Sequence, residues 1–414
     1  MTGRLRGRAV GAAAIGLVVV PLGIGAGYAW DGSAPPSAMT TATAPTPTPS
    51  PSADEFPQLT PAVARQLDEA VRKVMAEAQV PGVLVSLSAP GKGEYVRAFG
   101  VADKATGRPM ATDLNMRIGS ETKTFTVTAL LELVDKGEVG LDDPIGKYVD
   151  GVPGGDRITL RELAGMRSGL FNYSGDEGFF KALTADPRRQ FTPQELLAYA
   201  FRHPVQFEPG AKFEYCNTNL ILLGLVVEKV SGRKLADYVN DNVVEPAGLR
   251  HTLFPTGAEF PSPHAQGYTQ QTASGKTEDA ADWNPSYGWA AGAMISDLGD
   301  MRKWAEVLAT GKLLTPATQA QRLKVSPAGD LPDTGYGLGI FNVEGWIGHN
   351  GSLPGYQSLT VYLPQARATM VVLLNTDISY RGSEPSSLFG RAITETVTPR
   401  HLFELPAAPV TGQH

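Results

Sequence analysis

One stretch near the end of the chain decides the fold class: residues 346–375, WIGHNGSLPGYQSLTVYLPQARATMVVLLN. Short apolar or alternating runs bounded by turns are predicted strands, at 337–343, 346–348, 357–363 and 369–375. Residues 364–368 are a predicted hairpin connection. Because sequential strands joined by short turns pair side by side in opposite directions, this part of the chain predicts an antiparallel sheet.

The rest of the folded part extends this sheet. Residues 83–87 and 95–99 are two further predicted strands, and residues 141–286 between the early and late strands show a mostly helical pattern. A helix capped by Thr60 and another near residues 388–396 begin and close the folded part. We therefore expect an α/β protein of α+β type, with an antiparallel sheet flanked by N- and C-terminal helices and a mostly helical insertion.

The first residues of the chain indicate export. Arg4, Arg6 and Arg8 precede residues 9–29, which carry no charge. A basic start followed by an apolar run is typical of a signal peptide, and roughly 20 apolar residues also suffice to span a bilayer. We expect residues 1–30 to be a signal peptide or membrane anchor, the chain's one contact with a membrane, and the protein to lie outside the cell or in the cell envelope.

The composition of residues 31–414 divides them into a linker, a folded domain and a tail. Residues 31–57 are rich in Pro, Thr and Ser and have almost nothing to bury, so we expect a disordered linker. Residues 58–400 are the predicted catalytic domain and residues 401–414 a C-terminal tail.

Several classes of function are excluded by composition. The formal net charge is -6, with Lys+Arg 36 and Asp+Glu 42, whereas a nucleic-acid partner would need a basic face. The one cysteine, Cys216, excludes an intramolecular disulfide. No H-E-x-x-H, Cys/His cluster or Gly-rich phosphate loop is present, and no G-x-S-x-G marks a nucleophile elbow. We expect neither a metal nor a cofactor.

The first candidate for chemistry is Ser120-Glu121-Thr122-Lys123, at the start of a helix predicted over residues 120–136. Residues i and i+3 share a helix face, which places Lys123 beside Ser120. A serine hydroxyl needs a base to remove its proton, and a lysine becomes that base only when it is desolvated. The alternative is a serine that caps a helix with an ordinary lysine one turn later.

Two more candidates follow along the chain. Tyr215 would shuttle protons with a pKa lowered by a protonated lysine, and Asn217 would hold a substrate amide carbonyl. His349 would pass a proton near neutral pH, and Gly351 would let a substrate backbone lie close to a strand edge. The alternatives are a capped loop for the first pair and a turn glycine after a surface histidine for the second.

The order and spacing of the three motifs resemble those of the serine penicillin-recognising hydrolases, the class C β-lactamases and their relatives. The similarity is closest to the secreted serine D-Ala-D-Ala carboxypeptidases. It extends from about residue 71 to residue 376. Further matching segments are 99–103, 166–170, 207–210, 264–268, 291–296 and 336–339.

The resemblance implies a role for each site residue. Ser120 is expected to be the nucleophile, Lys123 and Tyr215 the pair that removes its proton and later activates water, and His349 stands where other members have lysine. The backbone N–H groups of Ser120 and Ser352 would form the oxyanion hole. Substrate would contact a further set: Asn217, Asn350, Gly351, Ser352 and Tyr287, with Phe179 or Phe180 on the opposite wall.

One departure from the family pattern concerns charge. The similar carboxypeptidases bind the substrate carboxylate with an arginine just before the histidine motif, but residues 340–348 contain no cation and include Glu344. A cation from elsewhere would have to replace it, such as Arg302, Arg367 or Arg381. The resemblance implies a D-Ala-D-Ala carboxypeptidase-like hydrolase of cell-wall peptides that also binds β-lactams. The alternatives are an esterase, a β-lactamase or a penicillin-binding module that is acylated without turnover.

Overall fold

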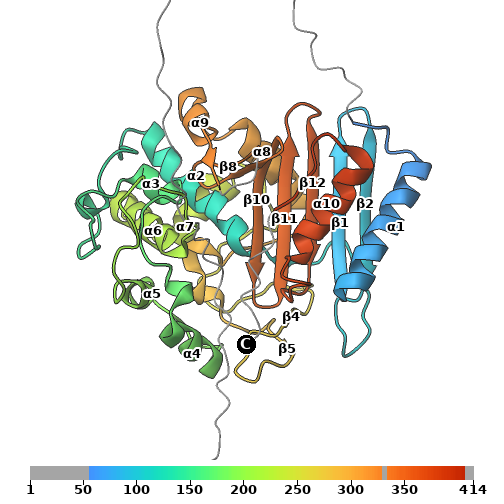
Figure 1. Cartoon of the computed structure of the whole chain (residues 1–414), viewed down its shortest axis with the longest axis horizontal. Coiled ribbons are helices and arrows are strands. Elements are labelled where there is room, and N and C mark those ends of the chain that lie inside the picture. The colour runs from blue at the N-terminus through green and yellow to red at the C-terminus, as the bar shows by residue number, and fades with distance from the viewer. Residues whose placement is uncertain (1–55, 329–332, 406–414) are drawn as a thin grey trace, which may run out of the picture.

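A computed structural model describes residues 56–328 and 333–405 of the chain. Its main sheet has eight strands, namely β1 (Gly82–Ala89), β2 (Gly93–Gly100), β7 (Ser326–Pro327), β8 (Thr334–Tyr336), β9 (Phe341–Val343), β10 (Trp346–Leu353), β11 (Tyr356–Leu363) and β12 (Ala368–Leu374). Their order is β2-β1-β12-β11-β10-β9-β8-β7, and every neighbouring pair is antiparallel (Figure 1). The predicted fold class is therefore confirmed.

Two helical layers cover the two faces of this sheet. Helices α1 (Pro61–Ala78) and α10 (Pro385–Val397) pack together on one face, and α8 (Leu298–Thr310) packs on the other (Figure 1). The side chains of β1 alternate accordingly, because Val83 and Val85 join the core under α1 and α10 while Leu84 joins the core under α8. As predicted, the Thr60 side chain caps α1 by accepting from the Val63 N–H at 3.3 Å.

The second half of the molecule lies beyond β10 and is mainly helical (Figure 1). It contains α2 (Thr122–Asp135), α3 (Leu160–Ala164), α4 (Glu177–Ala185), α5 (Pro193–Ala200), α6 (Asn217–Ser231), α7 (Leu235–Val239) and α9 (Pro316–Arg322). The predicted insertion, 141–286, is less helical than expected beyond residue 244. There, repeated Pro and Gly residues replace helix by loops around a hairpin of β4 (Tyr268–Thr269) and β5 (Glu278–Asp279).

Two predicted element boundaries differ from the structure. Residues 337–343 are not one strand, because a turn closed by the Gly337 N–H and the Ile340 carbonyl at 2.9 Å separates β8 from β9. The helix predicted from Ser120 begins as a 3₁₀ turn, η1 (Gly119–Glu121), before α2.

The ends of the chain are described only in part. The signal or anchor segment, 1–30, and nearly all of the predicted linker lie outside the described residues, as do residues 406–414. Phe56 is 2% exposed and packs in the core under α1 and α10, as does Phe403 from the predicted tail. No helix in the described part of the chain is long and apolar enough to cross a membrane.

Candidate active site

The candidate site lies where the main sheet meets the helical half. The turn η1, which carries Ser120, packs against β10 and β11, while α2 continues from it and packs on α6. This contact requires Gly119, whose φ is +52°. A side chain at this position would bring its Cβ to 2.8 Å from the Ser352 nitrogen, which is too close. The backbones of Ser120 and Ser352 are thereby held next to each other.

Lys123 and Ser120 meet as their spacing predicts. Lys123 Nζ lies 2.7 Å from Ser120 Oγ and donates to the Ala291 carbonyl at 2.7 Å. The Lys123 side chain is completely buried, and this desolvation holds its pKa well below the usual value, although Cys216 partly opposes the effect. A neutral amine has a lone pair for the Ser120 proton and an N–H for Ala291, so the arrangement suits a general base.

Tyr215 lies over the same pair of residues. Lys123 Nζ is 4.9 Å from the centre of the Tyr215 ring, and the phenol hydrogen-bonds Ser120. The expected lowering of its pKa is wrong. Burial raises the pKa of Tyr215, and Glu384 and Cys216 add to this, while the hydrogen bond with Ser120 opposes it. Tyr215 is therefore a neutral phenol that can donate a proton.

His349 is buried beside Tyr215, with ring centroids 6.1 Å apart. Its Nδ1 contacts the Asn350 carbonyl, which can only accept, so Nδ1 carries the proton. Nε2 then accepts from the Tyr336 hydroxyl at 3.1 Å. Burial lowers the pKa of His349 to about 3, a value to which the charged form of Lys123 contributes and which the hydrogen bond to the Asn350 carbonyl opposes. The ring therefore stays neutral at physiological pH, contrary to the expected proton transfer near neutrality.

The predicted substrate contacts are divided between the walls of the site and the core. Asn217 begins α6, is partly exposed, and donates through Nδ2 to Ser174 Oγ at 3.1 Å. Tyr287 is buried, and its carbonyl accepts from the Tyr173 hydroxyl at 2.6 Å. Phe179 is a core residue that packs edge-on against Tyr173, which leaves the partly exposed Phe180 as the available member of that pair.

Gly351 is required for a different reason from the one predicted. A Cβ at this position would lie 2.0 Å from the Ile118 carbonyl oxygen and 2.5 Å from Ser358 Oγ. The Ile118 carbonyl is itself fixed by the Ser358 hydroxyl at 2.9 Å. The glycine therefore lets the chain's own backbone, just before Ser120, approach β10, independently of any substrate.

Asn350 and Ser352 bring an unpredicted acid into the site. Asn350 Nδ2 donates to Glu384 Oε2 at 2.8 Å, and the Ser352 hydroxyl also hydrogen-bonds this carboxylate. Glu384 is the residue before α10 and is partly exposed. The only sequence signal for Glu384 was its position directly before Pro385, since a proline after an acid is typical of the start of a helix.

A second missed acid lies beneath the nucleophile. Glu121 is 1% exposed and turns towards Ser358 and Thr360 of β11, and Oε1 has no hydrogen-bond partner among the described residues. Burial raises the pKa of Glu121 to about 8, although both hydroxyls oppose the rise. The position of Glu121 in the Ser120 motif gave no indication that its pKa would be raised.

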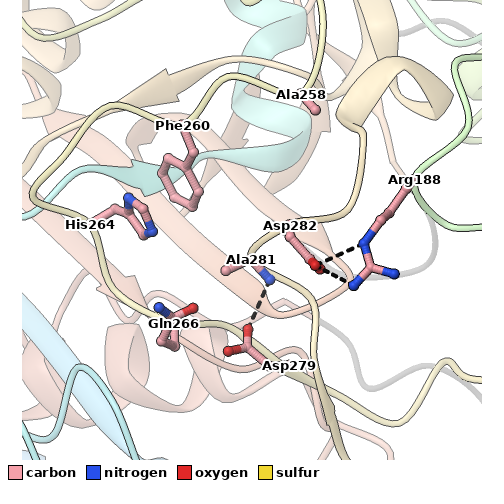
Figure 2. Close-up of a pocket in the computed structure, with 8 residues that line it drawn as sticks. All are labelled: Arg188, Ala258, Phe260, His264, Gln266, Asp279, Ala281 and Asp282. Carbon is pink, nitrogen blue, oxygen red and sulfur yellow. Dashed lines mark hydrogen bonds and ion pairs between the residues drawn. The ribbon is translucent and has the colours of Figure 1, made fainter. Parts of the chain in front are cut away.

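The structure also contains a cavity of about 510 Å³ outside this site. Figure 2 shows its lining, which consists of Arg188, Ala258, Phe260, His264, Gln266, Asp279, Ala281 and Asp282. Arg188 and Asp282 form an ion pair across it. None of the predicted site residues lines this cavity, and it does not contribute to the chemistry at Ser120.

One group of potential metal ligands occurs in the described ranges, formed by His251, Asp297 and Asp300. Its atoms already have partners. His251 Nδ1 contacts Asp297 at 2.5 Å, and the Lys303 ammonium lies 3.0 Å from Asp300. A cation would have to displace that ammonium, so the group does not suit a metal ion.

Comparison with known proteins agrees with this geometry. The beta-lactamase family model matches residues 67–387. The putative penicillin-binding protein PbpX of Bacillus subtilis is 24% identical over 333 residues, 78% of this chain and 80% of that protein. A D-aminopeptidase of Brucella anthropi is 28% identical over 320 residues, 75% of this chain but 59% of the relative's length.

Two solved structures share the fold over most of their length. A D-stereospecific amidohydrolase from Streptomyces sp. has a TM-score of 0.70 and 30% identity, covering 77% of this chain and 95% of that one. A D-amino acid amidase from Ochrobactrum anthropi SV3 has a TM-score of 0.71 and 27% identity, covering 80% and 98%. The chain therefore belongs to the beta-lactamase family, within its serine hydrolase fold.

Proposed function

We propose that this protein is a serine amidohydrolase that transfers a D-configured acyl group to Ser120 and then to water. The observation that carries the proposal is the 2.7 Å contact of Ser120 Oγ with Nζ of the completely buried Lys123, whose pKa desolvation holds well below its usual value. Support for the substrate class comes from similar proteins that are named as a D-stereospecific amidohydrolase, D-amino acid amidases and D-aminopeptidases.

Acylation follows from the positions of these groups. Ser120 Oγ attacks the amide carbonyl carbon while its proton passes to Lys123 Nζ. The negative charge on the carbonyl oxygen is stabilised by the backbone N–H groups of Ser120 and Ser352, and each such donor contributes about 3 kcal/mol in acyl-transfer enzymes. The C–N bond then breaks, and the leaving amine takes a proton from the neutral Tyr215 hydroxyl, which Lys123 restores.

Deacylation reverses these roles. A water molecule attacks the Ser120 ester, and its proton passes through Tyr215 or directly to Lys123. The ester bond breaks, Ser120 Oγ regains its proton, and the acid product leaves. In this scheme His349 stays neutral and orients the wall beside Tyr215 through its contact with Tyr336.

A D-Ala-D-Ala carboxypeptidase is the second candidate, favoured by the similarity to a putative penicillin-binding protein. It needs a cation for the free carboxylate, and the three arginines considered for this are poorly placed. Arg302 pairs with Glu94 at 2.5 Å, beside β2. Arg367 follows β11, about 20 Å along the strand from the partner of Ser352, Gln357.

The third arginine, Arg381, stacks on Tyr380 with its guanidinium 5.0 Å from the ring centre. Within residues 56–328 and 333–405 it forms no ion pair with Glu384, three residues later. The charge in the site therefore favours hydrolysis of substrates without a free carboxylate over carboxypeptidase activity.

The proposal also covers where the protein works. We propose that the basic and apolar start of the chain exports the domain and that the Pro/Thr-rich segment spaces it from the cell envelope, where peptidoglycan supplies D-alanyl peptides. Recovery of the unprocessed chain from the cytosol would refute this part of the proposal.

The test compares kcat/KM for D-alanine amide, L-alanine amide, the peptide D-alanyl-D-alanine and a penicillin. The proposal predicts multiple turnovers, a preference for D-alanine amide over L-alanine amide of at least tenfold, and loss of all activity in Ser120→Ala. A single stoichiometric burst with penicillin and no turnover of any amide would instead identify a penicillin-binding module.

A further inference from the structure

The candidate site has an acid at its rim that has no described cationic partner. Glu384 accepts from Asn350 Nδ2 at 2.8 Å and hydrogen-bonds Ser352, the residue whose backbone N–H is the proposed oxyanion donor. The nearby charge that acts on it is another acid, Asp377. A substrate whose reacting carbonyl is held by the Ser352 N–H therefore has this acid beside the same residue.

We infer that Glu384 determines the specificity of the proposed hydrolase by rejecting substrates that carry a free carboxylate next to the scissile bond. Substrates that are uncharged or cationic at that position are accepted, which selects primary amides, esters and peptides with a blocked C-terminus. This inference rests on the proposed function for the identity of the nucleophile, Ser120.

The strength of the effect follows from the distance and the surroundings. Two like charges a few ångströms apart near a protein surface repel strongly, because water screens them only partly. A substrate carboxylate would also displace the Asn350 amide from Glu384 or remain without a donor. We expect a ten- to hundredfold loss of kcat/KM for a free acid relative to its amide.

The discrimination has a predictable pH dependence. Burial raises the pKa of Glu384 to about 6, Asp377 adds to this, and the hydrogen bonds from Asn350 and Ser352 oppose it. Glu384 is therefore neutral below this pH and anionic above it. A substrate C-terminus, with a pKa near 3.5, stays ionised throughout, so repulsion appears as pH rises from 5 to 7.5.

The other described titratable groups around Glu384 do not neutralise it. Tyr215, on the loop before α6, is neutral because burial raises its pKa. Arg381, in the turn before α10, stacks on Tyr380. Asp377, which follows β12, accepts from the Gly355 N–H at 3.0 Å and from Thr269 Oγ1 at 3.0 Å.

The experiment uses two matched pairs of substrates with the full chain. D-alanyl-D-alanine amide and D-alanyl-D-alanine share the inner peptide bond, and its cleavage is followed through release of D-alanine amide or D-alanine, leaving groups that differ in charge. The esters 4-acetoxybenzamide and 4-acetoxybenzoate differ in the same way and require only that Ser120 be acylated. For each pair, the ratio of kcat/KM for the uncharged to the charged member is measured at pH 5 and 7.5.

The wild type is expected to give a ratio of ten to a hundred at pH 7.5 that falls severalfold at pH 5. In Glu384→Gln the ratio should fall about tenfold at pH 7.5 and lose its pH dependence. Glu395→Gln is the control, because Glu395 is exposed on α10, the helix that Glu384 precedes, and pairs with Arg391, so this variant should behave as the wild type. Thermal unfolding checks that each variant is folded.

A wild-type ratio near one, or an unchanged ratio in Glu384→Gln, would overturn the inference. Should that variant fail to fold, the pH dependence of the wild-type ratio decides, and a ratio that is flat between pH 5 and 7.5 counts against Glu384. If the ester pair is discriminated while no D-alanyl amide is hydrolysed, the role of Glu384 stands and the proposed amidase function fails.

Discussion

At the scale of single residues, the site depends on a completely buried lysine whose pKa is held well below its usual value. Lys123 is completely buried, and its described polar partners are Ser120 and the Ala291 carbonyl, both at 2.7 Å. A charged ammonium there would lack a counterion, so desolvation keeps the amine neutral and ready to accept the Ser120 proton.

Lys123→Met tests this role, since Met fills a similar volume without a base. General-base catalysis typically contributes 10²- to 10⁴-fold, and we expect kcat/KM to fall by about that factor. The acid limb of the wild-type pH profile should also disappear, because it reports protonation of Lys123 and its coupled partner Tyr215. A variant that keeps more than a tenth of the activity would contradict the assignment.

The acid beneath the nucleophile leads to a prediction about stability. Glu121 has a pKa of about 8 in the folded protein against 4.5 for an exposed glutamate. Between these values the folded state holds more protons than the unfolded state, so stability falls as pH rises, by up to about 5 kcal/mol at about 1.4 kcal/mol per pH unit.

Glu121→Gln should remove this loss, because glutamine has the shape of the neutral acid but does not titrate. Urea unfolding at pH 5 and pH 8 measures the difference, with the exposed Glu138→Gln as control. Equal losses of stability between pH 5 and pH 8 in the wild type and in Glu121→Gln would show that Glu121 does not titrate in this range.

The sequence was informative about some of these residues and silent about others. Ser120 and Lys123 are three positions apart on one helix, so local geometry alone places them together. Tyr336 and Glu384 join the site through the pairing of distant strands and the packing of α10, which no local pattern records. The desolvation of Lys123 was expected, but the pKa shifts of Tyr215, His349 and Glu121 were missed, because they depend on burial in the assembled core rather than on neighbours in sequence.

At the scale of elements, the site is shaped by the contact between η1 and β10. Gly119 and Gly351 allow the two backbones to approach, and the Ser358 hydroxyl fixes the Ile118 carbonyl between them. This contact sets the relative position of the Ser120 and Ser352 N–H groups, on which the proposed oxyanion hole depends.

Gly351→Ala is expected to disturb this contact. The added methyl would meet the Ile118 carbonyl oxygen at 2.0 Å, which is backbone and cannot rotate away. We expect a loss of about 1–3 kcal/mol in the free energy of unfolding and at least a tenfold loss in kcat/KM through the displaced turn. Gly299→Ala on α8 is the control, because its Cβ would lie at an ordinary 3.4 Å from Asp297. An unchanged Gly351→Ala enzyme would contradict the account.

Elements with a clear periodic pattern were predicted well. The strands at 357–363 and 369–375 agree with β11 and β12 to within one residue, and the hairpin between them was expected. By contrast, β10 continues to Leu353 past the predicted end at Gly348, because its second half turns polar where it borders the site. Hydropathy alone does not identify a half-strand whose side chains are polar or absent.

At the scale of the whole molecule, the sheet separates two cores. One core packs under α1 and α10, and the other joins the sheet to α8 and the helical half, where Ser120 lies (Figure 1). Changes confined to the first core should therefore alter stability more than chemistry.

Phe56→Ala tests this separation. Phe56 is 2% exposed in the α1–α10 core, and loss of a buried phenylalanine side chain typically costs about 3 kcal/mol. We expect that loss in urea unfolding together with an unchanged kcat/KM below the unfolding transition. Phe180→Ala, on the helical side and partly exposed, should cost less. A large loss of activity in folded Phe56→Ala would mean that the two cores are coupled.

The central claim is that Ser120 forms an acyl-enzyme, and intact-protein mass spectrometry tests it most directly. After brief incubation with a penicillin or an activated D-amino acid ester, the account predicts one adduct per chain, located by peptide mapping on Ser120 and lost with time as turnover proceeds. Ser120→Ala should remain unmodified while it unfolds at the wild-type temperature. An adduct on another residue, or equal modification of Ser120→Ala, would contradict the account.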